Sequence, residues 1–254
     1  MKLTFLGTGT SQGVPVIACD CSVCMSNNIK DNRLRTSAMI TIDGFNYVID
    51  SGPDFRQQML RHKVQDLRAV LFTHEHKDHL SGLDDVRAFN FKHKKDMDVY
   101  CDYNVKNALY REYSYVFKNS KYPGVPKVKI HLIDKNNFFV VGNHTFQPIE
   151  VMHYKLPVLG YRIEDLTYIT DAKTISSEEM DKIMGTKTLV INALRTESHI
   201  SHFNLKEALD LISYIKPEKA FLTHISHFMG KHDDVSKILP NNVYIAYDGL
   251  EVMI

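Results

Sequence analysis

The densest group of metal-binding residue types in the chain is the segment THEHKDH at residues 73–79. It follows the apolar run 69–72, and an extended segment projects residues two apart to the same side, so His74 and His76 can bind one metal ion together. A turn after His76 would direct Asp78 and His79 toward a second ion. The pattern H-x-H-x-D-H arises by chance only about 0.003 times in a shuffled chain of this composition. We therefore interpret it as a metal site.

Three more residues of ligand type follow predicted strands in the second half of the chain: His153, Asp171 and His224. Each is a weak signal alone, because a single histidine after a strand is more often a hydrogen-bonded loop residue. Together with the first segment they provide seven nitrogen and oxygen ligands. That set is large enough for two divalent metals that share one carboxylate and a hydroxide.

Three of the four cysteines, Cys19, Cys21 and Cys24, lie within six positions. Such crowding disfavours disulfides and favours a metal site, and a closed zinc site needs a fourth ligand from elsewhere. His227, three residues after the last active-site candidate, is the best fourth ligand. Three thiols without metal are the alternative. Cys101 stands alone and is expected to be a packed core thiol.

Apolar and β-branched runs bounded by turn residues predict the regular elements. Strands are predicted at residues 2–6, 38–42, 47–49, 69–73, 127–133, 138–141, 145–151, 166–170, 188–193, 219–223 and 243–247. Helices are predicted at residues 54–61, 80–91, 103–118, 177–184 and 205–216. The last helix has the clearest ends, with Asn204 as N-cap, Glu207 three residues later and Pro217 after it. Asp43-Gly44 predicts a two-residue hairpin.

Hairpins and crossovers occur in both halves, which indicates an α/β fold of two mixed sheets packed face to face with helices outside. We expect one domain over residues 1–254, since no linker or low-complexity segment divides it.

The 31 basic and 30 acidic residues give a formal charge of +1, so no global basic field favours nucleic acid. With no export signal and no run of eighteen apolar residues, we expect a cytoplasmic protein with reduced thiols that does not insert into membranes. A homodimer is compatible with the sequence.

In its seven ligand candidates and the motif at 74–79, the chain resembles the metallo-β-lactamase superfamily. The resemblance extends from the first strand to His224. The resemblance implies an αββα sandwich with a dinuclear metal site. By it, one metal would be held by His74, His76 and His153, the second by Asp78, His79 and His224, and Asp171 would bridge them. Asp50, in VIDSG, matches an early aspartate that orients ligands from behind, although a turn-forming role is as well supported by the residues alone.

The cysteine loop and its histidine resemble a narrower group, the PhnP-like phosphodiesterase branch, typified by phosphoribosyl cyclic phosphate phosphodiesterase. That branch carries a structural zinc on three cysteines and one histidine, and an active-site histidine ahead of a helix. His202 fits this place, and His199 is its rival. The opening FLGTGTSQGVP is similar to the first loop of this branch and of tRNA 3′-processing endonucleases. Its GxGxxxG spacing and the following Pro15 exclude a dinucleotide-binding loop.

The resemblance favours hydrolysis of a small or cyclic phosphodiester by two divalent metals, Mn²⁺, Zn²⁺ or Fe, with one further structural Zn²⁺. His202, Asp78 and Asp171 would carry the catalysis. Phosphate clamps and solvated surface charges are equally good interpretations of Arg33, Arg35 and Arg87.

Two alternatives use the same metals, a nuclease and a thioester or lactone hydrolase. Balanced charge and the lack of an inserted arm disfavour the nuclease. A zinc-stabilised binding protein without catalysis is the least favoured alternative, because all seven ligand positions are filled.

Overall fold

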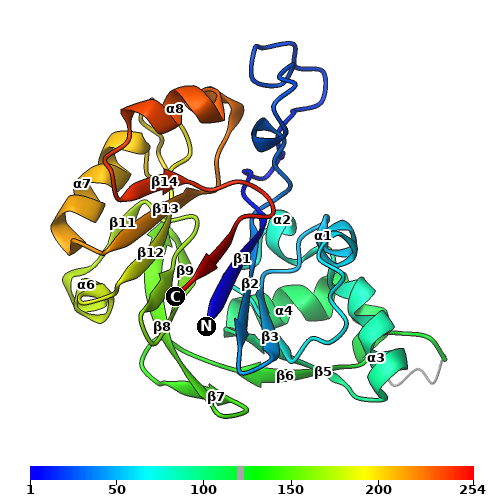
Figure 1. Ribbon diagram of the computed structural model, residues 1–254. Coiled ribbons are helices and arrows are strands. Elements are labelled where there is room, and N and C mark those ends of the chain that lie inside the picture. The colour runs from blue at the N-terminus through cyan, green and yellow to red at the C-terminus, as the bar shows by residue number, and fades with distance from the viewer. Residues whose placement is uncertain (119–122) are drawn as a thin grey trace.

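The computed structural model describes residues 1–118 and 123–254, and in it two β-sheets face each other across an apolar core (Figure 1). The first sheet has the order β15-β1-β2-β3-β4-β5-β6. Its strands are β1 (Lys2–Gly7), β2 (Ser37–Ile42), β3 (Phe45–Ile49), β4 (Ala69–Leu71), β5 (Met97–Cys101), β6 (Val128–Leu132) and β15 (Glu251–Met253).

The second sheet has the order β11-β8-β9-β10-β12-β13-β14, and β7 pairs with β8 outside this path. Its strands are β7 (Phe139–Val141), β8 (His144–His153), β9 (Leu156–Ile163), β10 (Leu166–Tyr168), β11 (Thr174–Ile175), β12 (Thr188–Asn192), β13 (Lys219–Thr223) and β14 (Val243–Ile245). In both sheets antiparallel hairpins precede a parallel half: β3 to β6 run parallel in the first, and β10, β12, β13 and β14 in the second.

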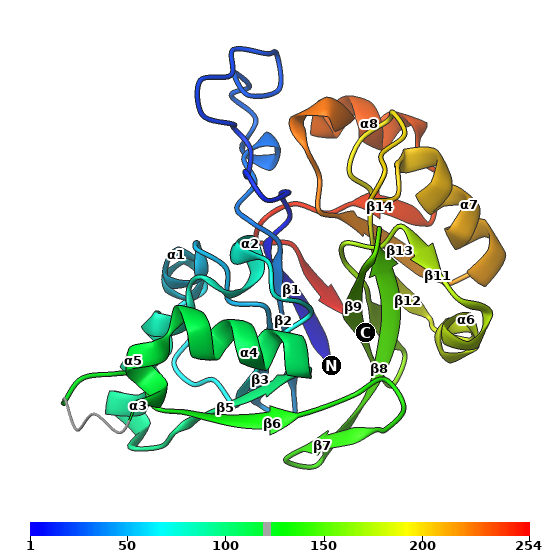
Figure 2. The same ribbon diagram turned by 180° about the vertical axis from the view of Figure 1, so that it is seen from behind.

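Helices cover the outer faces of both sheets (Figure 2). The first sheet carries α1 (Phe55–Arg61), α2 (Lys77–Leu80), η2 (Leu83–Val86), α3 (Arg87–His93), α4 (Tyr103–Glu112) and α5 (Ser114–Phe117). The second carries α6 (Ser177–Ile183), α7 (Leu205–Ile215), η3 (His227–Met229) and α8 (His232–Ile238), and a short 3₁₀ turn, η1 (Ile29–Asp31), lies in the projecting loop. The predicted αββα sandwich is confirmed. None of the helices in the described ranges is long and apolar enough to span a bilayer.

The strands are apolar on both faces because each sheet packs against the other sheet on one face and against helices on the opposite face. Along β1, Leu3 and Phe5 contribute to the core between the sheets, whereas Leu6 packs in the layer under the helices. Neighbouring β2 repeats the alternation, with Ile40 between the sheets and Met39 on the helix side. Burying each of these large side chains contributes about 1.5–3 kcal/mol. Strand β1 therefore links the two layers of the core.

Two predicted helices are interrupted, and some elements were not predicted. The helix expected at 80–91 begins as the 3₁₀ turn η2 and continues as α3, and the one expected at 103–118 breaks at Tyr113 into α4 and α5. Strands β9, β11 and β15 and helix α8 have no counterpart among the sequence predictions. In β9, Pro157 and Gly160 argue against a strand. Gly160 is required there because a Cβ atom would lie 2.8 Å from the carbonyl oxygen of Tyr168.

The hairpin predicted at Asp43-Gly44 joins β2 to β3, and both residues have positive φ, 50° and 80°. Positive φ at both central residues is typical of the type I′ turn, whose twist matches that of the two strands it joins. The capping box at the start of α7 is also present: Asn204 accepts a hydrogen bond from the amide of Glu207, whose side chain accepts one from the Asn204 amide.

Replacing Asn204 with alanine should therefore lower the free energy of unfolding by about 1 kcal/mol, the usual effect of losing an N-cap side chain. Urea unfolding followed by circular dichroism measures the change. Lys206→Ala, at an exposed position in the same turn, is the control and should alter stability much less. Equal stability of the two variants would show that this capping box does not stabilise the protein.

Candidate metal centres

The seven ligand candidates lie in loops that leave one edge of the sandwich. The segment with His74 and His79 follows β4, His153 ends β8, Asp171 follows β10, and His224 follows β13. Strands that run parallel deliver their carboxyl-terminal loops to the same edge, which is where open α/β sheets usually bind ligands. Asp171 and His224 both have left-handed backbones, with φ of 56°. This uncommon conformation turns each side chain out of its strand and toward the cluster.

Short distances between side chains place the predicted ligands in one cluster. The Nε2 atom of His74 lies 3.0 Å from Nδ1 of His76, and the rings of His76 and His153 are 5.2 Å apart. On the other side, Nε2 of His79 is 3.2 Å from a carboxylate oxygen of Asp78. The exposed position of His76 shows that this part of the cluster is open to solvent.

Asp171 lies between the two groups of ligands. One carboxylate oxygen is 3.4 Å from Nε2 of His79 and 3.2 Å from Nδ1 of His224. Burial opposes ionisation of this carboxyl, but the surrounding imidazoles, His224 first, outweigh burial and hold its pKa well below the usual value. Asp171 thus lies centrally in the cluster, and its bridging of two metals stays a prediction.

The electrostatics of the cluster fit divalent cations. Burial, followed by the neighbouring His79, lowers the pKa of His74 well below its usual value, and the neutral imidazole is the form that binds metals. His79 differs, because although burial disfavours its charged form, Asp78, Asp171 and Asp50 raise its pKa well above the usual value. Carboxylate oxygens of Asp78 and Asp171 lie 3.2 and 3.4 Å from its buried Nε2, but this nitrogen makes no hydrogen bond of good geometry among the described residues. A cation at this nitrogen would satisfy both the ring and the carboxylates.

A layer of hydrogen bonds behind the cluster fixes the rings. Asp50 accepts from Nδ1 of His79 at 2.7 Å and from the amide and hydroxyl of Thr73, so Nε2 of His79 faces the cluster. Burial raises the pKa of Asp50, although His79 opposes this shift. The Nδ1 atom of His153 lies 2.9 Å from the carbonyl oxygen of Ser201, which it can reach as a donor. These contacts support the orienting interpretation of Asp50.

Thr10 and Ser201 are supporting residues that sequence reasoning missed. The hydroxyl of Thr10, in the loop after β1, lies 3.2 Å from Nε2 of His224. The only signal for Thr10 is the polar GTGT segment directly after a buried strand. Ser201 acts through its backbone carbonyl, for which the side-chain type gives no signal.

His202 lies closer to the cluster than its rival His199. Its Nδ1 is 3.8 Å from Asp171, and its ring is 4.4 Å from that of His153 and 5.0 Å from that of His224. Burial, followed by the neighbouring His224, lowers the pKa of His202 to about 3. His199 packs 5.1 Å behind the His202 ring and contacts Ser201.

The three arginines considered as phosphate clamps already have partners in the protein. Arg33 is buried and donates to the hydroxyl of Thr8 and a backbone carbonyl, so a role as a clamp at this position is wrong. Arg35 pairs with Asp54 at 3.1 Å, and the half-exposed Arg87 pairs with Asp84 in the same turn.

The cysteine loop forms a second cluster that projects from the sandwich beyond the end of β1 (Figure 1). The Nδ1 atom of His227 is 3.3 Å from Sγ of Cys19, 3.4 Å from Cys21 and 3.5 Å from Cys24. A tetrahedral zinc with Zn–S of about 2.3 Å and Zn–N of about 2.0 Å separates its ligands by about 3.6 Å. The four side chains therefore have nearly the spacing of a closed zinc site.

Backbone amides also donate to the sulfur atoms of this cluster, from Cys24 to Cys21 and from Val16 to Cys24. The first of these bonds is the main reason why the pKa of Cys21 falls to about 6, which favours the thiolate that metals require. Burial instead raises the pKa of Cys24 to about 11. Cys101, as predicted, is a buried thiol in the layer between the first sheet and its helices.

Comparison with known proteins agrees with this geometry. Residues 45–225 match the Beta-lactamase superfamily domain. A diphosphatase from the PhnP family, known from its crystal structure, is 33% identical with a TM-score of 0.93, over 100% of this chain and 97% of that one. The chain therefore belongs to the metallo-β-lactamase superfamily and, within it, to the PhnP family. The chain is thus a hydrolase of the metallo-β-lactamase family, with a fold that binds divalent metals.

Two curated relatives carry other names. An octanoyltransferase of Porphyromonas gingivalis is 40% identical over 256 residues, covering 100% of this chain and 52% of that protein. A ribonuclease Z of Acaryochloris marina is 26% identical over 169 residues, covering 65% of this chain and 48% of that protein. The chain thus spans about half the length of these relatives.

The first prediction for the metal centres concerns the cysteine cluster. Elemental analysis of protein purified without chelator should approach three metals per chain, and Cys21→Ser should lose one zinc and melt at a lower temperature, because binding of a structural zinc is linked to folding. Ser22→Ala, the exposed neighbour, is the control. Unchanged metal content and melting temperature in Cys21→Ser would contradict a zinc site.

The second concerns Asp171. Asp171→Ala should abolish turnover of any substrate, because it removes the carboxylate between the two ligand groups, and should leave the zinc on the cysteines in place. Activity assays with elemental analysis measure both effects, and Asp181→Ala, an exposed carboxylate on α6, is the control. Activity retained in Asp171→Ala would remove this residue from the catalytic site.

Proposed function

We propose that the protein is a dinuclear metal-dependent phosphodiesterase that cleaves small or cyclic phosphodiesters. One observation carries the proposal: His202 is buried against Asp171, in contact with the ring of His153, within the seven-residue cluster. Membership in the PhnP family supports it, since a family member is named a diphosphatase and thus also acts on a phosphorus–oxygen bond.

The division of the ligands between two metals is taken from the resemblance to the superfamily, and the close packing of all seven side chains supports it. In this proposal His74, His76 and His153 hold one metal, Asp78, His79 and His224 hold the other, and Asp171 lies between them. When bound, the metals supply Lewis acidity and a nucleophile at neutral pH. Mn²⁺, Zn²⁺ and Fe are all compatible with nitrogen and oxygen ligands, and availability usually decides between them.

The residues of the chain orient the substrate. Because its pKa is lowered to about 3, His202 is neutral and donates a hydrogen bond to a phosphoryl or leaving oxygen. Asp50 holds His79 in the orientation in which Nε2 faces the cluster.

A small substrate fits the charge distribution better than a polynucleotide. A nuclease needs many phosphate contacts, which make its affinity fall steeply with salt. The net charge here is +1, and Arg33, Arg35 and Arg87 are bound to partners within the protein. We therefore propose a small phosphodiester as partner and do not expect structured RNA to be bound.

A second candidate, hydrolysis of an acyl ester or thioester, is favoured by the octanoyltransferase relative. Metals that polarise a phosphoryl oxygen also polarise a carbonyl. This candidate ranks second because the chain corresponds to about half of that relative, and the other half is an equally good source of its named activity.

A substrate panel distinguishes the two candidates. We expect cyclic and aryl phosphodiesters to be cleaved much faster than phosphomonoesters, octanoyl thioesters, lactones or precursor tRNA, with Mn²⁺ and Zn²⁺ tested separately and turnover only mildly dependent on salt. A phosphoanhydride diester tests the activity named for the diphosphatase. If the thioester or the tRNA proved the best substrate, the phosphodiesterase proposal would be wrong.

His202→Ala should lower the diester rate by roughly 10²-fold or more, the usual effect of losing one positioned hydrogen-bond donor to a reacting oxygen. Metal content should not change, because His202 is not one of the proposed ligands. His199→Ala is the matched control and should cost much less. Full diester activity in His202→Ala would refute its catalytic role and leave the ligand assignments intact.

A further inference from the structure

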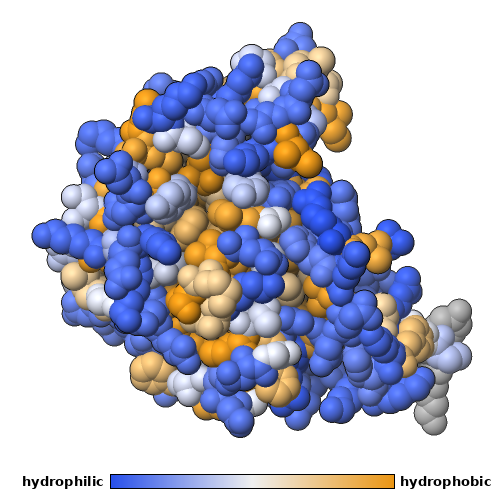
Figure 3. Space-filling view, in the orientation of Figure 1, coloured by the Kyte–Doolittle hydropathy of each residue, from blue (hydrophilic) through white to orange (hydrophobic). Residues whose placement is uncertain are grey.

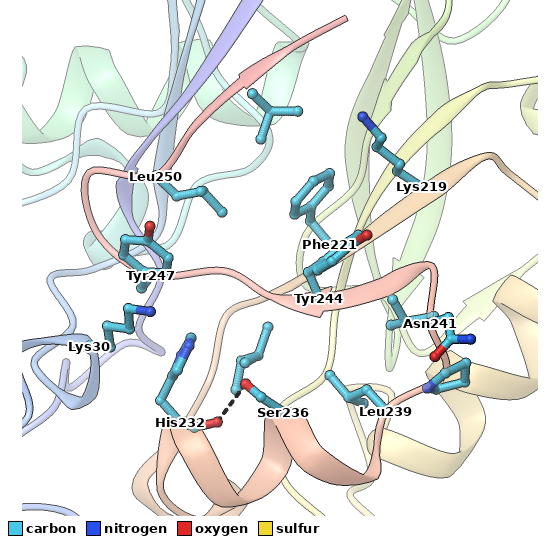
Figure 4. A pocket seen from close by; sticks show the side chains of 14 residues that line it. Lys30, Lys219, Phe221, His232, Ser236, Leu239, Asn241, Tyr244, Tyr247 and Leu250 are labelled. Carbon is cyan, nitrogen blue, oxygen red and sulfur yellow. Dashed lines mark hydrogen bonds between the residues drawn. The ribbon is translucent and has the colours of Figure 1, made fainter.

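A pocket of about 490 Å³ lies outside the metal centres, between α8, β13, β14 and the chain leading into β15 (Figure 4). Apolar side chains gather on the face of the molecule where these elements meet (Figure 3). The size is in the range of small-molecule sites. None of the candidate metal ligands lines it.

One end of the pocket concentrates hydrogen-bond donors from three segments. Lys30, from the projecting loop, His232, from the start of α8, and Tyr247 converge there (Figure 4). The Lys30 ammonium lies 4.6 Å from the centre of the Tyr247 ring, and the His232 ring meets the same tyrosine edge-on. Among the described residues, neither the ammonium nor the Tyr247 hydroxyl has a hydrogen-bond or ion-pair partner.

A buried arginine fixes the tautomer of His232. A guanidinium nitrogen of Arg33 approaches Nδ1 of His232 at 3.5 Å, and arginine can only donate. Nδ1 must therefore accept, which leaves the proton of the neutral ring on Nε2. Nε2 has no acceptor among the described residues, so this end of the pocket offers a second donor next to the ammonium.

The middle of the pocket is aromatic. The rings of Phe221 and Tyr244 lie 5.3 Å apart at an interplanar angle of 25°, and Tyr244 is 45% exposed. Leu250, directly before β15, and Val252, within it, also line the pocket. Phe221 is buried and supports the exposed ring of Tyr244, on which a flat ring can stack.

The charged side chains that line the pocket are basic. Lys30 lies at one end and Lys219 at the other, and no aspartate or glutamate in the described part of the chain lines the pocket. The whole protein has nearly equal numbers of acidic and basic residues, so this local excess distinguishes the pocket from the average surface. An anionic ligand would meet only basic and neutral side chains in the lining, with the buried Asp31 behind them, where it accepts a hydrogen bond from the His232 amide.

We propose that this pocket binds a small aromatic monophosphate, of the size of a nucleoside monophosphate. The phosphate lies at the end formed by Lys30, His232 and Tyr247, and the ring lies along Phe221 and Tyr244. This binding is independent of the proposed phosphodiesterase activity, because none of the residues involved belongs to the metal cluster.

Calorimetric titration with 5′-AMP, and with adenosine as its uncharged counterpart, tests the proposal. AMP should bind one per chain, and adenosine at least tenfold more weakly, since charge-assisted hydrogen bonds are worth more than 1.4 kcal/mol, a factor of ten. Lys30→Gln and Tyr244→Ala should each weaken AMP binding about fivefold or more. Lys237→Gln, an exposed lysine on the same helix as His232, should leave it unchanged.

The same titration on Asp171→Ala separates this pocket from the metal cluster. Binding retained in Asp171→Ala and reduced in Lys30→Gln supports the proposal. Equal binding of adenosine, no effect of Lys30→Gln and Tyr244→Ala, or loss of AMP binding in Asp171→Ala would each overturn it. Sedimentation that showed a homodimer dissociated by Tyr244→Ala would also overturn it, by assigning this face to a second copy of the chain.

Discussion

The buried carboxylate of Asp171 among four imidazole rings is the constraint on which the site depends. Asp50 and Asp78 add two more carboxylates around His79, so the edge of the sandwich holds a dense group of ionisable side chains away from water. Burying such groups is costly unless each is paired or binds a cation. The surrounding fold must therefore hold them in fixed positions. The left-handed backbones of Asp50, Asp171 and His224 show that this edge also accepts local strain.

The direction of the strands brings these ionisable side chains to one edge of the sandwich. Each sheet contributes parallel strands whose carboxyl ends face the cluster, and the core between the sheets keeps those ends in register. Tyr161 crosses this core from β9, and its buried hydroxyl donates to the carbonyl of Phe72, one residue before the metal-binding segment. The amide of Leu159 donates to the carbonyl of Thr73 in the same way. Strand β9 of the second sheet thus holds the ligand loop of the first.

Features of the fold and site that depend on local sequence could be predicted, whereas features that depend on tertiary contacts could not. The segment from His74 to His79 carries its spacing in the sequence, and so does the hairpin at Asp43-Gly44. Strand β9 was missed because Pro157 and Gly160 look like breakers. Its Gly160 in fact allows close approach of a neighbouring strand, which only the folded structure reveals. Thr10 was missed as a partner of His224 because 214 residues separate them and their contact arises from tertiary packing.

The two candidate metal centres are connected through one short turn. His224 and His227 enclose Ile225 and Ser226, and both of these residues are fixed by the fold: Ile225 exchanges backbone hydrogen bonds with the loop after β1, and Ser226 donates twice to the carbonyl of Leu194. The loop that Ile225 binds contains Thr10, which contacts His224, and leads on to the cysteines. A zinc bound by the cysteines and His227 would link the far end of that loop to the turn that carries His224. A zinc bound there would therefore help to hold His224 in position, in addition to any general effect on stability.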